Sequence, residues 1–255
     1  MNTVEAISPA FHQVLRRLKL SPMRETLPER FDLARQKKMP YQDFLELVLS
    51  DEAERRERLA TARRARRASL DPHMVMENWD ETAKVRFDRQ LFSELSTLRF
   101  LENHHHLLIL GPVGVGKTFL ATALGHIACR RNKNVLMGRA DKILKVLKAS
   151  RLDGTYDAQL RQLIRADLLI LDDLGLDQLD PDGSRDIYEI IVERHRCGSM
   201  IVTSNREPQE WLAMMTDPMR AQSAVDRLSN GAYELLIEGE SYRKRQKPGR
   251  EEPRQ

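Results

Sequence analysis

Eight residues near the middle of the chain have the types and the spacing of a phosphate-binding loop. They read G-x-x-x-x-G-K-T and are Gly111, Pro112, Val113, Gly114, Val115, Gly116, Lys117 and Thr118. Glycines let the backbone curl so that successive N–H groups point at phosphate oxygens, and the N-terminus of a following helix adds partial positive charge. Lys117 would reach the β- and γ-phosphates, and the Thr118 hydroxyl would ligate Mg²⁺. The loop therefore predicts nucleotide binding.

The segments on either side of this loop support that interpretation. The apolar run 107–110 predicts a strand before the loop, and residues 119–131 predict a helix after it. A phosphate-binding loop requires this context, whereas a glycine turn without chemical meaning does not.

Two carboxylates follow the apolar run 168–171, about 55 residues after the loop. Four successive apolar residues predict a strand that is buried on both faces, so Asp172 and Asp173 stand at the sheet edge where the phosphates would lie. We expect Asp172 to hold Mg²⁺ through water and Asp173 to orient or polarise the attacking water. The alternative for each is an acidic helix cap after a core strand.

An amide, Asn205, follows a third predicted strand, 199–204. If it projects between the loop and the acidic strand, it can position water against the γ-phosphate. Thr-Ser-Asn also begins an ordinary turn, and the residues by themselves favour that simpler interpretation.

The order of predicted elements indicates an α/β fold. Strands are expected at 107–110, 134–138, 167–172, 199–204 and 234–237, with a helix over 81–99 before them and helical stretches of ten residues or more between them. Strands that alternate with helices favour a five-stranded parallel sheet with helices on both faces.

The first third of the chain predicts helices only, because it contains no glycine and no alternating apolar pattern. Helices are expected from Ser8, over 23–38 and from Tyr41, and the first and third have apolar faces that we expect to be buried: Phe11, Val14, Leu15, Leu18, Phe44, Leu45, Val48 and Leu49. We predict a small all-α N-terminal domain over 1–75, an ATPase domain over 76–243 and a basic, disordered tail over 244–255, with the boundary near Leu70-Asp71-Pro72.

Composition excludes several other classes of protein. The two cysteines are far apart, and the consecutive histidines His104, His105 and His106 precede a strand, where neighbouring side chains point to opposite faces. Neither a disulfide framework nor a metal site is therefore indicated. No apolar run approaches the roughly 18 residues of a membrane helix, and the start lacks the apolar core of a signal peptide, so we expect a cytoplasmic protein without a membrane partner.

Basic residues gather in two places and indicate a polyanion as partner, although the formal net charge is only +4. The first is the arginine arm, a run with few intervening acids that contains Arg55, Arg56, Arg63, Arg64, Arg66 and Arg67. The second is a stripe on the predicted helix 139–151, opposite the apolar Ile143, Val146 and Leu147, that consists of Lys142, Lys145 and Lys148. Both are candidate contacts to a nucleic-acid backbone, and the alternative is a solvated surface.

These motifs together resemble the AAA+ ATPases of the DnaC and IstB group, and most of all IstB, the ATPase helper of insertion-sequence transposases. The resemblance covers nearly the whole chain. It rests on the phosphate-binding loop, on Leu-Leu-Ile-Leu-Asp-Asp-Leu-Gly, on Ile-Val-Thr-Ser-Asn, and on two later segments, Ala224-Val225-Asp226-Arg227-Leu228 and Gly239-Glu240-Ser241-Tyr242-Arg243.

The resemblance implies an ATPase that uses ATP and Mg²⁺ and assembles into a ring or spiral with nucleotide between neighbouring copies. Asn205 falls at the sensor-1 position, and Arg227 falls where such ATPases carry an arginine finger for the neighbour's γ-phosphate. By itself, an Asp-Arg pair on a helix is more often a surface ion pair. Arg243 matches a possible sensor-2 cation, and Trp79 is expected near the adenine or in the core. Most AAA+ proteins have Glu where this chain has Asp173, which favours slow or partner-dependent hydrolysis.

The preferred hypothesis is a DNA-dependent ATPase that oligomerises on double-stranded DNA and assists a cognate transposase. The first alternative is a DnaC-like replicative helicase loader, although the arginine arm and the absence of cysteine before Cys129 favour the transposition helper. A small-molecule kinase would need neither the arginine arm nor the late Asp-Arg pair. An ATP-gated assembly factor with negligible turnover is the last alternative, which Asp173 leaves open.

Overall fold

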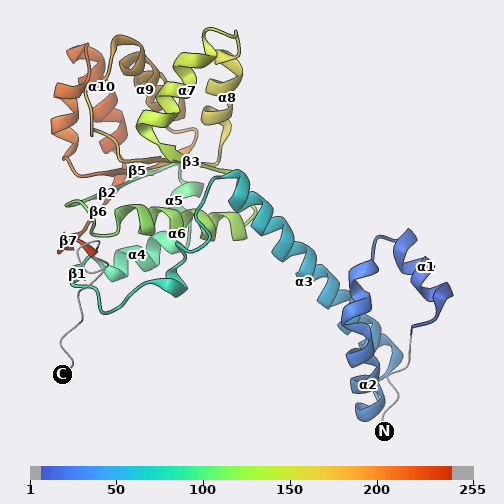
Figure 1. Cartoon of the computed structure of the whole chain (residues 1–255). Coiled ribbons are helices and arrows are strands. Elements are labelled where there is room, and N and C mark those ends of the chain that lie inside the picture. Colours follow the sequence, from blue (N-terminus) through green and yellow to red (C-terminus); the bar gives the residue numbers. More distant parts are fainter. Residues whose placement is uncertain (1–6, 243–255) are drawn as a thin grey trace, which may run out of the picture. The chain divides into compact units, whose positions relative to one another are not determined.

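The computed structural model describes residues 7–242, and its chain contacts divide the protein into two compact units, Met1–Ala62 and Arg63–Gln255 (Figure 1). The long helix α3 (Tyr41–Arg67) begins in the first unit and ends in the second. No helix within the described range is both long and apolar enough to cross a membrane.

The first unit consists of helices, as predicted. They are α1 (Pro9–Arg17), the 3-10 turn η1 (Ser21–Glu25), α2 (Leu27–Lys37) and the first part of α3. Ser8 caps α1 by accepting a hydrogen bond from the amide of Phe11. The four buried side chains of its small core are Leu15, Met23, Leu27 and Val48.

The apolar faces of α1 and α3 are buried only in part, which corrects the expectation from sequence. Leu15 and Val48 enter the core, and Phe44 stacks on Phe31 with ring centroids 5.4 Å apart. A core of four side chains covers one turn of each helix, so the neighbouring apolar residues stay exposed: Phe11, Val14, Leu18, Leu45 and Leu49. The second helix also begins later than predicted, after the separate turn η1.

The second unit is built on a five-stranded parallel sheet with the order β3-β4-β5-β2-β6. Leu110 pairs with Ser204, and Leu171 pairs with Val202, so the loops that follow β2, β4 and β5 leave the same edge of the sheet. The strands are β2 (His106–Leu110), β3 (Val135–Arg139), β4 (Leu168–Asp172), β5 (Ser199–Ser204) and β6 (Ala232–Leu236).

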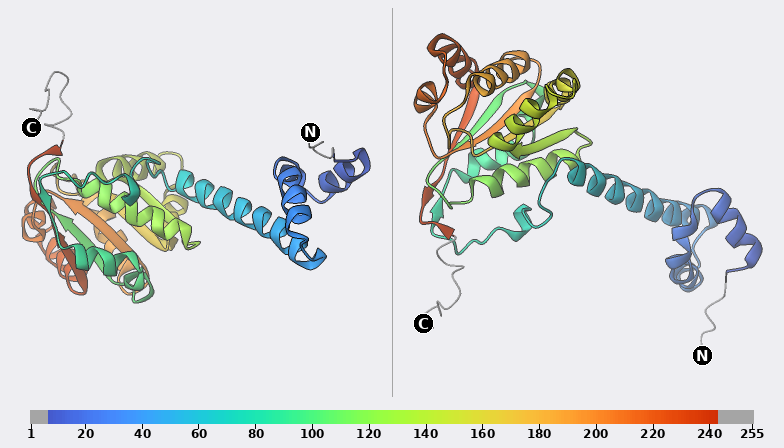
Figure 2. Two further views of the ribbon diagram at one scale, coloured as in Figure 1. Left: turned by 90° about the horizontal axis from the view of Figure 1, so that it is seen from below. Right: turned by 45° about the horizontal axis from the view of Figure 1, so that its top comes forward.

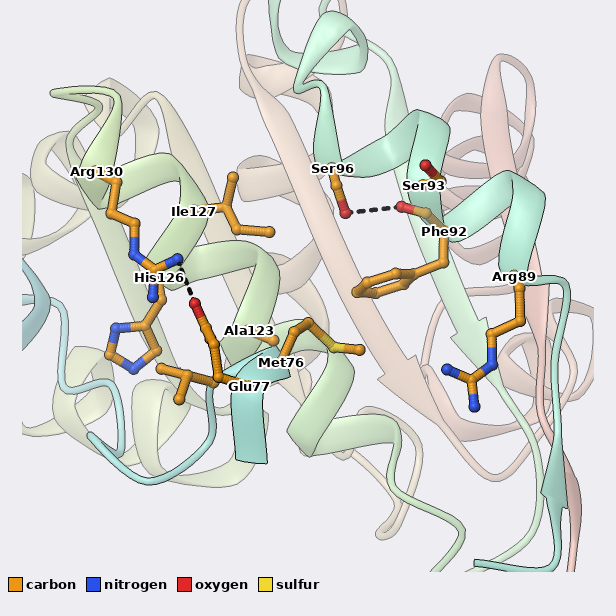
Figure 3. Close-up of a pocket in the computed structure, with 11 residues that line it drawn as sticks. Met76, Glu77, Arg89, Phe92, Ser93, Ser96, Ala123, His126, Ile127 and Arg130 are labelled. Atoms are coloured by element: carbon orange, nitrogen blue, oxygen red, sulfur yellow. Dashed lines mark hydrogen bonds and ion pairs between the residues drawn. The ribbon is translucent and has the colours of Figure 1, made fainter. Parts of the chain in front are cut away.

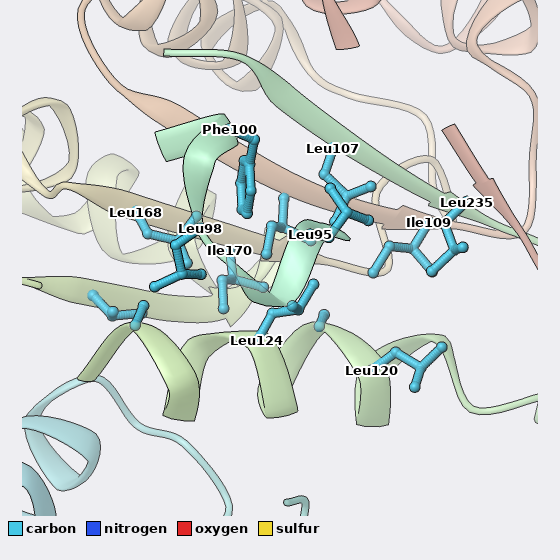
Figure 4. Close-up of a cluster of buried hydrophobic side chains, with 14 of the residues drawn as sticks. Leu95, Leu98, Phe100, Leu107, Ile109, Leu120, Leu124, Leu168, Ile170 and Leu235 are labelled. Atoms are coloured by element: carbon cyan, nitrogen blue, oxygen red, sulfur yellow. The ribbon is translucent and has the colours of Figure 1, made fainter. Parts of the chain in front are cut away.

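Helices cover both faces of this sheet, which confirms the predicted fold class (Figures 1 and 2). One face carries α4 (Arg89–Ser96), α5 (Arg99–Glu102) and α6 (Lys117–Arg130), and the other carries α7 (Ala140–Ser150), α8 (Tyr156–Arg165), α9 (Pro181–Arg194), η3 (Pro208–Met214) and α10 (Pro218–Ser229). Buried Leu and Ile side chains from β2, β4, α4 and α6 interlock in the first layer (Figure 4).

Residues 81–88 do not continue the helix that the sequence predicts over 81–99. The carboxylate of Asp88 accepts a hydrogen bond from the amide of Leu91 and starts α4 there. The preceding residues Val85–Arg86 instead form β1, which pairs antiparallel with β7 (Glu238–Gly239). This contact depends on residues about 150 positions later in the chain, so local helical patterning could not reveal it.

The division between the units falls inside α3, whereas the sequence places the domain boundary after residue 75. Ala65, Ala68 and Leu70 are buried in the core of the second unit. The carbonyl of Ala68 also accepts a hydrogen bond of 3.1 Å from the amide of Met137 in β3. By its contacts, the segment 63–75 therefore belongs to the second unit.

Candidate nucleotide-binding site

The loop Gly111–Thr118 connects the end of β2 to the start of α6, as the sequence predicts. Gly114 and Gly116 have φ angles of +84° and +102°, in the left-handed region that side chains rarely adopt. Gly116 is the residue just before α6, so the amides at the start of this helix face the loop. This arrangement forms a cradle for anions at a helix N-terminus.

Lys117 lies within the loop and is only 6% exposed. Its Nζ donates hydrogen bonds to the carbonyls of Gly111, at 2.8 Å, and Pro112, at 2.7 Å. The loop itself therefore holds the ammonium group beside the position where phosphates would enter.

The hydroxyls of Thr118 and Thr203 meet at one carboxylate. Thr118 Oγ1 donates to Asp172 Oδ1 at 2.8 Å, and Thr203 Oγ1 donates to the same oxygen at 2.7 Å. Asp172 is 6% exposed, at the end of β4. The second carboxylate oxygen, Oδ2, accepts no hydrogen bond from any residue in the described part of the chain.

The donor set at this point suits a magnesium ion. Thr118 and Asp172 supply a hydroxyl and a carboxylate oxygen side by side, and Mg²⁺ prefers oxygen ligands and retains several waters. The two residues that the sequence predicts as metal ligands therefore lie side by side, and their binding of Mg²⁺ stays a prediction.

Asp173 and Asn205 line the same cavity as the loop, with a volume of about 540 Å³. Asp173 has a φ of 56° and donates its amide to Thr203 Oγ1 at 2.9 Å. Asn205 directly follows β5 and is exposed. The fold thus brings both predicted water-positioning residues to the phosphate side of the cavity, whose size is within the usual range of about 300–1,000 Å³ for ligand sites.

Trp79 also lines this cavity and packs on aromatic neighbours. Its ring makes edge contacts with Phe87 and Phe119, with centroids 5.5 and 5.2 Å apart. A Cβ atom on Gly116 would lie only 3.0 Å from its Cη2 atom. Trp79 therefore lies beside the loop and in the aromatic core, and its expected place near the adenine stays a prediction.

The C-terminal strap, which we define as residues 237–242, runs along the phosphate-binding loop. The amide of Ile237 donates to the carbonyl of Leu110, and the amide of Tyr242 donates to the carbonyl of Gly114, both at 2.8 Å. Tyr242 lines the cavity. Arg243, predicted as a further phosphate-binding cation, and the predicted tail over 244–255 lie outside the described residues.

Arg227 lies at the other edge of the sheet. It is half-buried near the end of α10, where its Nη1 donates to the carbonyl of Ser223, at 3.1 Å, and to the Ser223 hydroxyl. It lines a separate cavity of about 640 Å³ with residues that precede β2 and β6. The intervening strand β2 has five residues and spans about 16 Å, so Arg227 is separated from the phosphate-binding loop of its own chain.

The three consecutive histidines have different environments in the structure. His106 is buried, its Nδ1 accepts a hydrogen bond from the amide of Met200, and burial lowers its pKa to about 4. The ring of His105 instead lies against Tyr233, with centroids 5.9 Å apart. His104 is exposed.

The arginine arm divides into paired and exposed side chains. Arg55 and Arg56 both donate to the buried carboxylate of Glu52, whose pKa falls to about 2 through these hydrogen bonds. Arg64 donates to the carbonyl of Cys129 at the end of α6. The remaining three, Arg63, Arg66 and Arg67, are exposed.

The lysine stripe on α7 is partly neutralised. Lys145 and Lys148 form ion pairs with Asp141 and Asp180, at 3.5 and 2.6 Å, whereas Lys142 is exposed. The buried face of the helix consists of Ala140, Leu144, Leu147 and Ser150, and the expected core residue Val146 is 54% exposed.

Another cavity, of about 400 Å³, lies between α4 and α6 (Figure 3). Arg130 donates to Glu77 at its rim, at 3.0 Å, and Phe92 and Ile127 form its apolar walls. No predicted site residue lines it, so it is separate from the phosphate-binding loop.

The comparison with known families agrees with this geometry. The model of the family described as "IstB-like ATP binding protein" matches residues 13–249. This chain belongs to that family. The match includes both the helical first unit and the sheet-based second unit.

Three known proteins illustrate the similarity of this IstB-like chain. An insertion-sequence ATP-binding protein of Mycobacterium tuberculosis is 36% identical over 243 residues, which are 95% of this chain and 97% of the relative. The crystal structure of the DnaC helicase loader is similar in fold, with a TM-score of 0.52 and 21% identity over 62% of this chain and 95% of that one. The AMPPCP-bound DnaA of Aquifex aeolicus has a TM-score of 0.54 and 25% identity, over 65% and 50% of the two chains.

Two parts of the site of this IstB-like chain escaped the sequence analysis. Thr203 stands two residues before Asn205, in a motif that the sequence did single out, but only the register of β4 and β5 brings its hydroxyl to Asp172. The C-terminal strap was noticed as a motif, and its place along the loop depends on the pairing of β1 with β7.

Proposed function

We propose that this IstB-like chain is an ATPase that uses Mg²⁺, oligomerises on double-stranded DNA and assists the transposase of an insertion sequence. The observation that carries the proposal is the convergence of the phosphate-binding loop, Asp173 and Asn205 at one cavity, together with the hydrogen bond that Asp172 accepts from Thr118 of the loop. The insertion-sequence relative, which matches along 95% of the chain, supports the biological role.

In this proposal, the loop amides and Lys117 bind the triphosphate. Lys117 exchanges its two carbonyl partners in the loop for phosphate oxygens when ATP enters. Thr118 and Asp172 hold Mg²⁺, and the bound ion neutralises part of the phosphate charge. Asp173 and Asn205 hold the attacking water against the γ-phosphate.

Arg227 completes the site of a neighbouring copy. Its cavity lies at the sheet edge opposite the loop, which supports a role in another copy rather than in its own chain. A planar guanidinium stabilises charge that spreads over the phosphoryl oxygens as the bond to the leaving group breaks. Assembly and hydrolysis would then be coupled, because an isolated copy lacks this cation.

The exposed arginines at the end of α3 are the proposed contacts to the DNA backbone. Arg63, Arg66 and Arg67 have no ion pair among the described residues, in contrast to Arg55 and Arg56. Lys142 is the corresponding exposed cation on α7. Phosphate contacts of this kind give affinity without sequence preference and weaken as salt rises.

A DnaC-like helicase loader is the second candidate, because the DnaC crystal structure is similar in fold. That similarity covers 62% of this chain, whereas the Mycobacterium tuberculosis insertion-sequence relative covers 95% of it, including the helical first unit. The longer match favours the transposition helper.

The first test is ATP turnover with and without long duplex DNA, measured by phosphate release. DNA should stimulate the parent chain, and Lys117→Ala should remove both turnover and ATP-dependent DNA binding, because the phosphates lose their main cation. Unchanged ATP-dependent binding by Lys117→Ala would exclude the proposed role of the loop.

DNA contact is tested by the salt dependence of binding. Each of Arg66→Ala and Arg67→Ala should reduce the slope of log K against log[salt] by about 1. Arg185→Ala is a matched control, since this exposed arginine lies on α9 and does not belong to the arginine arm. Equal effects of all three substitutions would contradict a contact specific to the end of α3.

A further inference from the structure

Thr203 is the residue that connects the two acidic side chains of the site. It stands in β5, beside Ile109 of β2, and its exposed fraction is 0%. Its hydroxyl bonds both to the Asp172 side chain and to the Asp173 backbone.

The Thr203 hydroxyl is the donor in one of these hydrogen bonds and the acceptor in the other. As a donor, Oγ1 binds Asp172 Oδ1 at 2.7 Å, and as an acceptor it receives the amide of Asp173 at 2.9 Å. The carbonyl of the same threonine accepts the amide of Leu174 at 2.9 Å. Three successive residues, the last of β4 and the two that follow it, are therefore tied to a single residue of β5.

This arrangement determines where both carboxylates lie. Thr203 and Thr118 both donate to Asp172 Oδ1. These two hydrogen bonds keep the carboxylate from rotating, so Oδ2 always remains the oxygen that is available to the proposed metal ion. The hydrogen bond from the Asp173 amide to Thr203 Oγ1 stabilises the Asp173 backbone, whose φ of 56° is unfavourable for a residue with a side chain. This backbone conformation sets the direction in which the Asp173 side chain points.

We propose that Thr203 is a positioning residue that presents Asp172 to Mg²⁺ and Asp173 to water during ATP hydrolysis. The proposal rests on the ATPase activity proposed above. It assigns the effect to the Thr203 hydroxyl rather than to its volume, because the methyl group makes neither bond.

Two substitutions separate the hydroxyl from the volume. Thr203→Val keeps nearly the same shape and removes the hydroxyl, and Thr203→Ser keeps the hydroxyl and removes the methyl group. Thr122→Val is the matched control, because Thr122 is equally buried in α6 and donates to the Thr118 carbonyl at 2.7 Å without contacting either aspartate.

The measurement is a Mg²⁺ titration of two signals from the full chain, the binding of a fluorescent ATP analogue and the turnover of ATP with duplex DNA. For Thr203→Val, the Mg²⁺ concentration at half-maximal response should rise about 10- to 100-fold, the usual effect of losing a hydrogen bond to a charged group. Thr203→Ser should stay within about threefold of the parent, and Thr122→Val should match the parent.

Affinity for the analogue in EDTA reports whether the fold is intact. It should change less than about twofold in Thr203→Val, because the phosphate cradle does not depend on this hydroxyl. If Thr203→Val does not bind the analogue, Thr203→Ala replaces it, since it also removes the hydroxyl and adds no apolar group beside the carboxylate.

Two results would overturn the proposal. One is a Thr203→Val chain with the Mg²⁺ requirement of the parent, and the other is a Thr203→Ser chain as defective as Thr203→Val. Failure of the proposed function looks different. A parent chain that binds the analogue and never hydrolyses ATP refutes the ATPase, while the Mg²⁺ dependence of binding still decides the role of Thr203.

Discussion

Asp173 illustrates how the backbone selects a residue type. Most AAA+ proteins carry Glu at this position, and this chain has Asp. The left-handed φ of 56° offers a physical reason, because Asp tolerates this region better than residues with longer side chains. The sequence indicated only that the side chain of Asp reaches less far toward water than that of Glu. The structure relates the choice of Asp to the backbone of the turn after β4.

Gly114 provides a second prediction at the scale of single residues. A Cβ atom there would lie 2.2 Å from Ser241 Oγ in the C-terminal strap, and φ is +84°. Gly114→Ala should displace the strap from the loop and weaken ATP binding about tenfold or more, as measured by titration with a fluorescent ATP analogue.

Gly154→Ala is the control for backbone strain. Gly154 has a similar φ of +73°, but a Cβ atom there meets nothing within 4 Å. Its ATP affinity should equal that of the parent. Equal affinity in the two variants would mean that the strap contact does not shape the loop.

Site residues that belong to a motif of fixed spacing were predictable from sequence, and those that depend on pairing between distant segments were not. Lys117, Thr118 and Asp172 follow from motif spacing and lie together as expected. Thr203 needed the register of two strands, and the strap needed the pairing of β1 with β7. Arg55 and Arg56 were predicted as DNA contacts because the pattern could not reveal that Glu52 is buried beneath them.

At the scale of elements, the start of β2 is sensitive to pH. His106 is buried and accepts the amide of Met200 in β5, so its neutral form belongs to the folded state. Burial lowers its pKa from 6.5 to about 4. The unfolded chain therefore binds a proton at a higher pH than the folded chain does.

The sign of the effect follows from this difference. The stabilisation is fully present above pH 6.5, declines as the pH falls, and is lost near pH 4; a shift of this size corresponds to about 3 kcal/mol. The protection factors of the β2 and β5 amides, which compare observed exchange with the intrinsic rate at each pH, should fall as the pH drops over this range, and much less so in His106→Gln. The same fall in parent and variant would assign the pH response to another group.

The helical elements of the first unit were predictable in type and less so in burial. The period of apolar residues identified α1 and α3, yet Leu18 and Leu49 are 61% and 52% exposed. A periodic pattern marks which residues share a helix face, and it does not reveal how far a small core extends along that face.

For the molecule as a whole, the sheet separates the two halves of the proposed chemistry. The loops after β2, β4 and β5 gather the ATP-binding groups at one edge, and Arg227 lies at the edge where β2 begins. One complete site of the proposed ATPase therefore requires two copies of the chain. The sequence predicted this assembly through family resemblance alone, since no spacing within one chain encodes a contact between copies.

A mixing experiment tests this central claim most directly. Arg227→Ala should bind ATP with nearly parental affinity and lose turnover about 10³-fold or more, and Asp173→Ala should also be inactive. Mixed in equal amounts on duplex DNA, the two should recover about one quarter of the parent's phosphate release, because a random head-to-tail assembly places an intact Asp173 against an intact Arg227 at that frequency. Absence of turnover at every mixing ratio, or full turnover by Arg227→Ala alone, would contradict the account.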